Sequence, residues 1–107
     1  MKTVRFHKEA RAELVHEVGV YTEVSPSLGE RFDKAVKAAV ERAAEFPDLG
    51  SPFLFGTRRV IPKKFHFSVA YLTLGDEIFI VAIAPDSRRP GYWGRRVSDV
   101  SQETSDK

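Results

Sequence analysis

The second half of the chain contains the sequence FSVAYLTL (67–74), followed by GD (75–76) and EIFIVAIA (77–84). Both eight-residue runs are rich in β-branched and aromatic residues, a composition that favours strands. Gly75 is the first of the two residues between them, which is the chemistry of a type II′ turn. Because both runs are apolar on both faces, we expect a β-hairpin at the centre of a sheet.

Two amphipathic helical patterns precede this hairpin. The first extends from about Lys8 to Val24 and is broken by Ser25-Pro26. The second starts with a capping box formed by Ser27 and Glu30, extends to about Glu45 and is stopped by Pro47. The short connection predicts an antiparallel helix hairpin. The faces expected to be buried contain Ala10, Leu14, Val18 and Tyr21 in the first helix, and Leu28, Phe32, Val36, Ala39, Ala43 and Phe46 in the second.

Short strands complete the expected sheet. Thr3–Phe6 predicts an N-terminal strand, and Arg58–Ile61 predicts a strand that ends or bulges at Pro62. Residues 48–56 are rich in proline and glycine and predict a loop. The result is an α+β fold, in which an N-terminal strand is followed by a helix hairpin packed on a small, mainly antiparallel sheet. We expect one domain over residues 1–97 and a flexible polar tail over residues 98–107.

Composition excludes several classes of protein. The chain has 107 residues, of which 42% are hydrophobic and 30% charged, as in soluble globular domains. It contains no cysteine, which excludes disulfides and cysteine-ligated metals. No apolar run approaches the roughly 20 residues of a membrane span, and no signal peptide is recognisable. We therefore expect a cytoplasmic protein without membrane contact. The three histidines are scattered, so we expect no metal and no cofactor.

The net charge of +2 is unevenly distributed. Residues 57–96 contain eight Lys and Arg residues against three acids, a net charge of +5, whereas the remainder of the chain carries −3. This asymmetry indicates either a surface that faces a polyanion or a merely solvated cationic face. In the run Ser87–Trp93, two arginines precede Tyr92 and the only tryptophan. Arginine beside aromatic rings suits RNA. The alternative is a C-terminal anchor, in which Tyr92 and Trp93 pack on the sheet edge.

The order of elements and several short motifs resemble the RelE/ParE superfamily of bacterial toxins from type II toxin–antitoxin modules. The resemblance extends from about Val4 to Arg96. At the two helices it rests on FHKEA (6–10), LGERF (28–32) and FP (46–47). In the sheet and beyond it rests on RR (58–59), KFHF (64–67), VAY (69–71), AIA (82–84) and RRPGYW (88–93).

The resemblance implies a growth-arresting toxin of a plasmid-stabilisation-like module. It also implies a cognate antitoxin that binds exposed apolar surface beside the helix hairpin and forms a hetero-oligomer with the toxin. RelE-like members are ribosome-dependent endoribonucleases that cut mRNA, whereas ParE-like members poison DNA gyrase without hydrolysis, so whether the chain is an enzyme stays open. Ser68 stands where ribonuclease members often place arginine, and Pro85 where many have histidine. These departures, with a long helix pair, favour gyrase. A third alternative is a non-toxic RNA-binding module.

The resemblance also suggests site residues. If the protein is a ribonuclease, Arg88 and Tyr92 match positions with phosphate-binding and proton-transfer roles and are the candidate catalytic residues. We expect His7 and His16 on the surface, and His66 as a packed or hydrogen-bonded strand residue. Strand alternation does not decide which of two adjacent arginines, 58 and 59, faces away from the helices. The candidate target-binding residues are Arg58, Arg59, Lys63, Lys64, Arg89 and Trp93.

Overall fold

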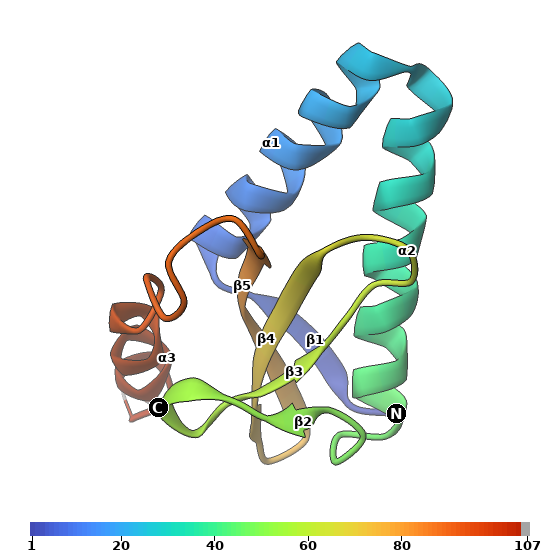
Figure 1. Ribbon diagram of the computed structural model, residues 1–107. Coiled ribbons are helices and arrows are strands. Elements are labelled where there is room, and N and C mark those ends of the chain that lie inside the picture. Colours follow the sequence, from blue (N-terminus) through green and yellow to red (C-terminus); the bar gives the residue numbers. More distant parts are fainter. Residues whose placement is uncertain (106–107) are drawn as a thin grey trace.

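The structure is a computed structural model that describes residues 1–105, with side chains described up to Val100. A five-stranded sheet of order β1-β5-β4-β3-β2 lies against a hairpin of two long helices (Figure 1). All neighbouring strands are antiparallel except β1 and β5, which are parallel, so the expected α+β architecture is confirmed. The elements are β1 (Thr3–Phe6), α1 (Lys8–Val24), α2 (Pro26–Glu45), β2 (Ser51–Pro52), the 3-10 helix η1 (Leu54–Gly56), β3 (Arg58–Val60), β4 (Phe67–Leu74), β5 (Glu77–Pro85) and α3 (Arg95–Ser105).

The helix hairpin forms where the sequence predicts it, but its second helix starts earlier than expected. Ser25, not Ser27, is the N-cap of α2, because the Ser25 hydroxyl accepts a hydrogen bond from the Leu28 amide at 3.1 Å. Pro26 then occupies the first helical turn, where its missing N–H leaves no hydrogen bond unmade. The predicted capping box is therefore wrong, since a serine followed by proline is an equally good helix start.

The two helices pack closely near their connection. At Gly29, an added Cβ would lie 1.9 Å from the Thr22 hydroxyl oxygen, so only glycine fits between α1 and α2 at this point. The predicted faces of both helices are buried or partly buried, with one exception. Phe46 is 59% exposed, because α2 ends at Glu45 and the chain turns away before this residue.

The two faces of the sheet bury different kinds of residue. On the helix face, large side chains of β4 and β5 such as Phe67, Tyr71 and Ile80 pack against α1 and α2. The opposite face is lined mainly by small residues, including Ala70, Ala82 and Ala84, which leave room for the indole of Trp93. This second face has no long helix over it and is the face on which the candidate site forms.

A β-bulge explains why the β5 sequence is apolar throughout. In the β4–β5 pairing, Ala70 is opposite Ala82 and Tyr71 is opposite Ile80, so Val81 is the extra residue. A bulge shifts the alternation of side chains by one position. Consequently Ile80 and Ile83 both face the helices, although they are three positions apart, an odd spacing that would otherwise put them on opposite faces. The central position predicted for β4 and β5 is confirmed by the strand order.

Three elements were not anticipated from the sequence. β2 and η1 lie within residues 48–56, where a loop was predicted, and β2 is a two-residue edge strand whose proline blunts the edge. The third is α3, which covers residues 98–105 of the predicted tail and buries Val100 completely. Its apolar positions are too few to reveal a helix from periodicity alone. Residues 106–107 of that tail lie outside the described residues.

Candidate functional site

The segment that follows β5 returns across the open face of the sheet and is held there by Trp93. This side chain is only 1% exposed and packs against Phe53 and Phe55, with ring centroids 5.7 Å away in both cases. The aromatic contacts need a small residue at Gly94, where an added Cβ would lie 2.8 Å from the Phe55 ring. Trp93 is therefore a buried anchor, as the alternative interpretation of the sequence proposed.

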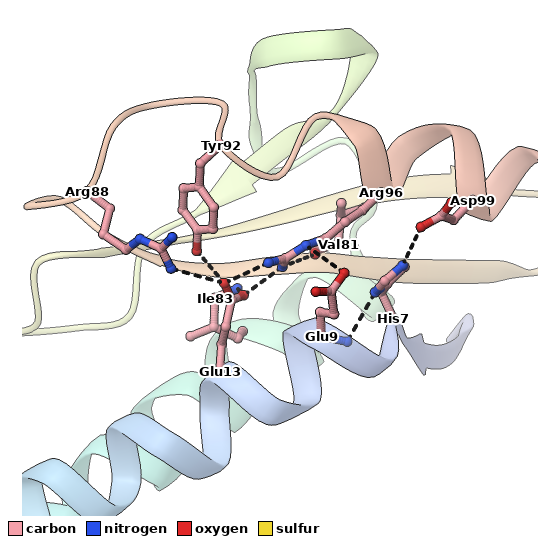
Figure 2. A network of polar contacts seen from close by, with 9 residues as sticks. All are labelled: His7, Glu9, Glu13, Val81, Ile83, Arg88, Tyr92, Arg96 and Asp99. Atoms are coloured by element: carbon pink, nitrogen blue, oxygen red, sulfur yellow. Dashed lines mark hydrogen bonds and ion pairs between the residues drawn. The ribbon is translucent and has the colours of Figure 1, made fainter.

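Glu13 of α1 lies at the centre of a network of hydrogen bonds and ion pairs (Figure 2). Its Oε1 accepts hydrogen bonds from the Ile83 amide at 3.0 Å and from Arg96 Nη1 at 2.8 Å. Its Oε2 accepts hydrogen bonds from Arg96 Nη2 at 3.0 Å and from the Tyr92 hydroxyl. Arg88 adds an ion pair with a separation of 3.8 Å between Nη1 and Oε2. One carboxylate thus joins α1, β5, the loop and the start of α3.

The network forms here because β5 extends beyond the end of β1, its neighbour in the sheet. β1 pairs with β5 only as far as Ile80, so the backbone groups further along that edge need other partners. The carbonyl of the bulge residue Val81 accepts a hydrogen bond from Arg96 Nη1 at 3.1 Å, while Glu13 accepts one from the Ile83 amide. Two side chains therefore replace the missing strand, and no buried side-chain nitrogen or oxygen is left unpaired among the described residues.

The environment of Tyr92 holds its proton in place. Burial, then the hydrogen bond to Glu13 and the charge of that carboxylate, raise the pKa of the Tyr92 phenol well above its usual value. Burial lowers the Arg96 pKa, but the hydrogen bond to Glu13 and the charges of Glu13, Tyr92 and Glu9 together raise it above its usual value. At neutral pH, Tyr92 therefore acts as a fixed hydrogen-bond donor and Arg96 as a permanent cation.

His7 extends the network toward α3. It is 8% exposed, accepts the Glu9 amide through Nδ1 as the N-cap of α1, and contacts Asp99 through Nε2 at 3.0 Å. The surface position predicted for His7 is therefore wrong, because a cap residue beside α3 is enclosed by it. His16 is exposed as expected. His66 is exposed just before β4, so its predicted packing within a strand is also wrong.

The second part of the site is a cavity of about 220 Å³ on the open face, called the arginine pocket here. The Arg59 guanidinium lies 4.6 Å from the Phe53 ring centroid, and that of Arg88 lies 3.7 Å from the Tyr92 ring centroid. Arg59 also donates a hydrogen bond to the Ser68 hydroxyl at 3.3 Å. The residues that line the arginine pocket are Phe53, Arg59, Ser68, Ala84, Pro85, Asp86, Arg88, Arg89, Pro90, Tyr92 and Trp93.

The predicted site residues separate into groups. Arg59, Arg88, Arg89, Tyr92 and Trp93 meet at the arginine pocket. Arg58 does not, since it faces the helix side and donates to the Gly50 carbonyl at 2.7 Å.

The two lysines lie in the connection between β3 and β4. Lys64 lines a neighbouring cavity of about 570 Å³ together with His66 and Arg88, and it adopts a left-handed φ of 70°. Lys63 is exposed in the same connection. Neither lysine lines the arginine pocket.

Within residues 1–105, no three His, Asp or Glu side chains are arranged to hold a metal ion. None of the helices in this part of the chain is both long and apolar enough to span a membrane.

Comparison with known proteins decides the family. The model of the "ParE toxin of type II toxin-antitoxin system, parDE" matches residues 4–90. The chain belongs to this ParE toxin family. A solved structure described as "Chromosomal ParDE TA system from P. aeruginosa" is similar with a TM-score of 0.69 and 19% sequence identity. The similarity covers 79% of this chain and 96% of that one, which supports the fold. Comparison with curated proteins finds no match.

The ParE match includes only part of the site. Glu13, Arg59, Arg88 and Arg89 lie inside residues 4–90, whereas Tyr92, Trp93 and α3 follow the matched region. The partner groups of Glu13 are thus contributed from both sides of the match boundary.

Glu13 and Arg96 are the residues that sequence reasoning missed. In the sequence, Arg96 is one of eight basic residues in the region 57–96, and Glu13 is one of several acids on an amphipathic helix. Nothing local indicates a pair whose members are 83 positions apart.

Proposed function

We propose that this ParE-family toxin arrests growth by poisoning DNA gyrase, and that it acts by binding instead of hydrolysis. The observation that supports this is the state of Tyr92, whose hydroxyl donates to Glu13 and whose pKa is raised. A residue that transfers a proton during RNA cleavage needs a pKa near neutral pH and a free path to the substrate. Tyr92 has neither property.

The other groups around the arginine pocket fit the same proposal. Ser68 is almost completely buried and bonded to Arg59, and Pro85 has no titratable group. Asp86 is the one carboxylate among the described residues that lines the pocket, and it is exposed. The pocket therefore offers cations that can bind a target, without a paired acid and base for in-line attack on a phosphate.

The test is a direct comparison of two targets. Purified toxin is added to DNA gyrase with relaxed plasmid and ATP, and separately to translating ribosomes with a defined mRNA. We expect loss of supercoiling and DNA breaks trapped on gyrase, while the mRNA stays intact. In cells, the DNA-damage response should precede any loss of mRNA. Cleavage of mRNA at ribosome-occupied codons with unimpaired gyrase would overturn the proposal in favour of a RelE-like activity.

The partner that neutralises the toxin is proposed to be a cognate antitoxin. Val20 and Val24 lie one turn apart near the end of α1 and are 43% and 72% exposed, which gives this end of the helix a small apolar surface. An amphipathic antitoxin segment would cover such a surface. Co-expression with the product of the adjacent small gene should restore growth of the cells, because the two proteins would bind each other in the cytoplasm. Val20→Glu should weaken that rescue, whereas Thr73→Glu at the far end of β4 should not.

A further inference from the structure

The arginine pocket contains two guanidinium groups that are already oriented. Arg59 lies over Phe53 and is also hydrogen-bonded to Ser68, while Arg88 lies over Tyr92, which is itself bonded to Glu13. An arginine stacked on a ring keeps one planar face against that ring, and its N–H groups point outward along its edge. Both cations therefore lose little conformational freedom when they bind a ligand.

The positive charges of the pocket are also not fully balanced by acidic side chains. Arg89 is exposed and forms no ion pair with a described residue, and Arg88 has only the 3.8 Å contact with a carboxylate that Arg96 already occupies twice. Asp86 is the one acid that lines the pocket, against three arginines. The excess positive charge calls for an anionic ligand.

The aromatic rings that line the arginine pocket favour an anion that also carries a flat ring. Phe53 and Tyr92 are only partly buried, and Trp93 closes the bottom of the pocket. Unpaired bases stack on aromatic rings and on guanidinium planes, while their phosphates accept hydrogen bonds from arginine edges. An acidic peptide would use only the edges. A paired duplex cannot place a base in a recess of about 220 Å³, because its bases are already stacked.

We propose that the arginine pocket binds a single nucleic-acid strand, with a phosphate between Arg59 and Arg89 and an unstacked base against the Phe53–Arg59 pair. This inference rests on the proposed function in one respect: the strand would be DNA held by gyrase. The toxin would then contact both components of the gyrase–DNA complex and not the enzyme alone.

The experiment measures binding without gyrase. Fluorescein-labelled oligo(dT) of twelve nucleotides is titrated with purified toxin, and anisotropy is followed at several salt concentrations. We expect Arg89→Ala to weaken binding about tenfold and to reduce the slope of log K against log salt by about one. Arg59→Lys keeps the charge but loses the planar stack, and should also weaken binding several-fold.

Arg31→Ala is the matched control, because Arg31 is an exposed arginine on α2 and does not line the pocket. It should bind the oligonucleotide as the parent does. Circular dichroism of each variant checks that it is folded. If the three variants bind equally, the pocket is not the site. If a twelve-residue poly-glutamate peptide binds as tightly and with the same arginine dependence, the site recognises acidic protein and the proposal is overturned.

The two proposals fail separately. Oligonucleotide binding without any effect on gyrase would refute the gyrase target and leave the strand site intact. Gyrase poisoning that is unchanged in Arg89→Ala, by a toxin that does not bind the oligonucleotide, would refute the strand site and leave the target intact.

Discussion

The arginines near the loop after β5 have two different roles: Arg96 stabilises the fold, whereas Arg59 and Arg89 are available to bind an anion. Arg96 is 9% exposed and makes two hydrogen bonds to Glu13, which is itself largely buried. Arg59 and Arg89 lie on the other side, where Phe53 and a single exposed acid face them. An arginine paired with a carboxylate is part of the fold, whereas one without a carboxylate partner retains its capacity for an outside anion. Partner geometry, not residue type, separates the two roles.

The Glu13 side must be complete for the arginine pocket to keep its shape. Tyr92 belongs to both sides, since its hydroxyl binds Glu13 and its ring supports Arg88. Four variants can break or sharpen the comparison, and their expected effects on stability decrease in order.

Trp93→Ala should have the largest effect, because Trp93 anchors the segment between β5 and α3, which connects Arg88 and Arg89 to Arg96. Removal of a fully buried indole typically costs about 3–5 kcal/mol of unfolding free energy. Chemical denaturation followed by circular dichroism measures the loss. A variant as stable as the parent would mean that the loop is held without its anchor, and the two sides would then be independent.

Glu13→Ala should come next, at about 3 kcal/mol. The substitution removes both hydrogen bonds from Arg96 to Glu13 and leaves Arg96 one carboxylate contact within the described residues, the 3.7 Å ion pair with Glu9. The Ile83 amide also loses its acceptor. The double variant with Arg96→Met should recover part of the loss, because the poorly compensated charge is then absent. The full double-mutant cycle gives the coupling energy. A coupling near zero would contradict the structural role assigned to the Glu13 side.

Tyr92→Phe should cost about 2 kcal/mol at neutral pH, since it removes a hydrogen bond to a carboxylate. An unfolded tyrosine ionises near pH 10. Because the folded state raises the Tyr92 pKa, the contribution is complete below about pH 10 and is lost as the pH rises above it. The stability difference between parent and variant should therefore shrink from pH 9 to pH 11. A difference that is constant over this range would show that the phenol is not held as described.

Arg89→Ala should have the smallest effect on stability, within about 0.5 kcal/mol, because the side chain is exposed and unpaired within the described residues. Its effect on growth arrest should nevertheless be large. The decisive measurement pairs a melting curve with growth after induced expression. A fully toxic Arg89→Ala would place the target-binding surface elsewhere on the molecule.

Arg88 lies between the two sides and tests where the boundary falls. Its side chain is 54% exposed, so Arg88→Ala should leave the fold intact, with a melting temperature close to that of the parent.

Much of the architecture was predictable because it depends on local sequence patterns. The spacing of apolar residues located α1 and most of α2, and the run from Phe67 to Ala84 located the central hairpin with its turn. These patterns arise from backbone periodicity, which acts over a few residues. The same logic failed for α3, whose few apolar side chains have meaning only against the sheet.

The sequence by itself determined the family, the order of elements and the presence of arginines beside aromatic rings in the last third of the chain. Only the tertiary structure decided which arginine does what. Alternation could not distinguish Arg58 from Arg59, and the pairing register with β4 puts Arg59 on the open face. Glu13 became the centre of the site because β1 ends too early to cover the bulge of β5. The unpaired backbone groups of β5 and the distant carboxylate that binds one of them are brought together by three-dimensional packing, and no local sequence pattern indicates such a pairing.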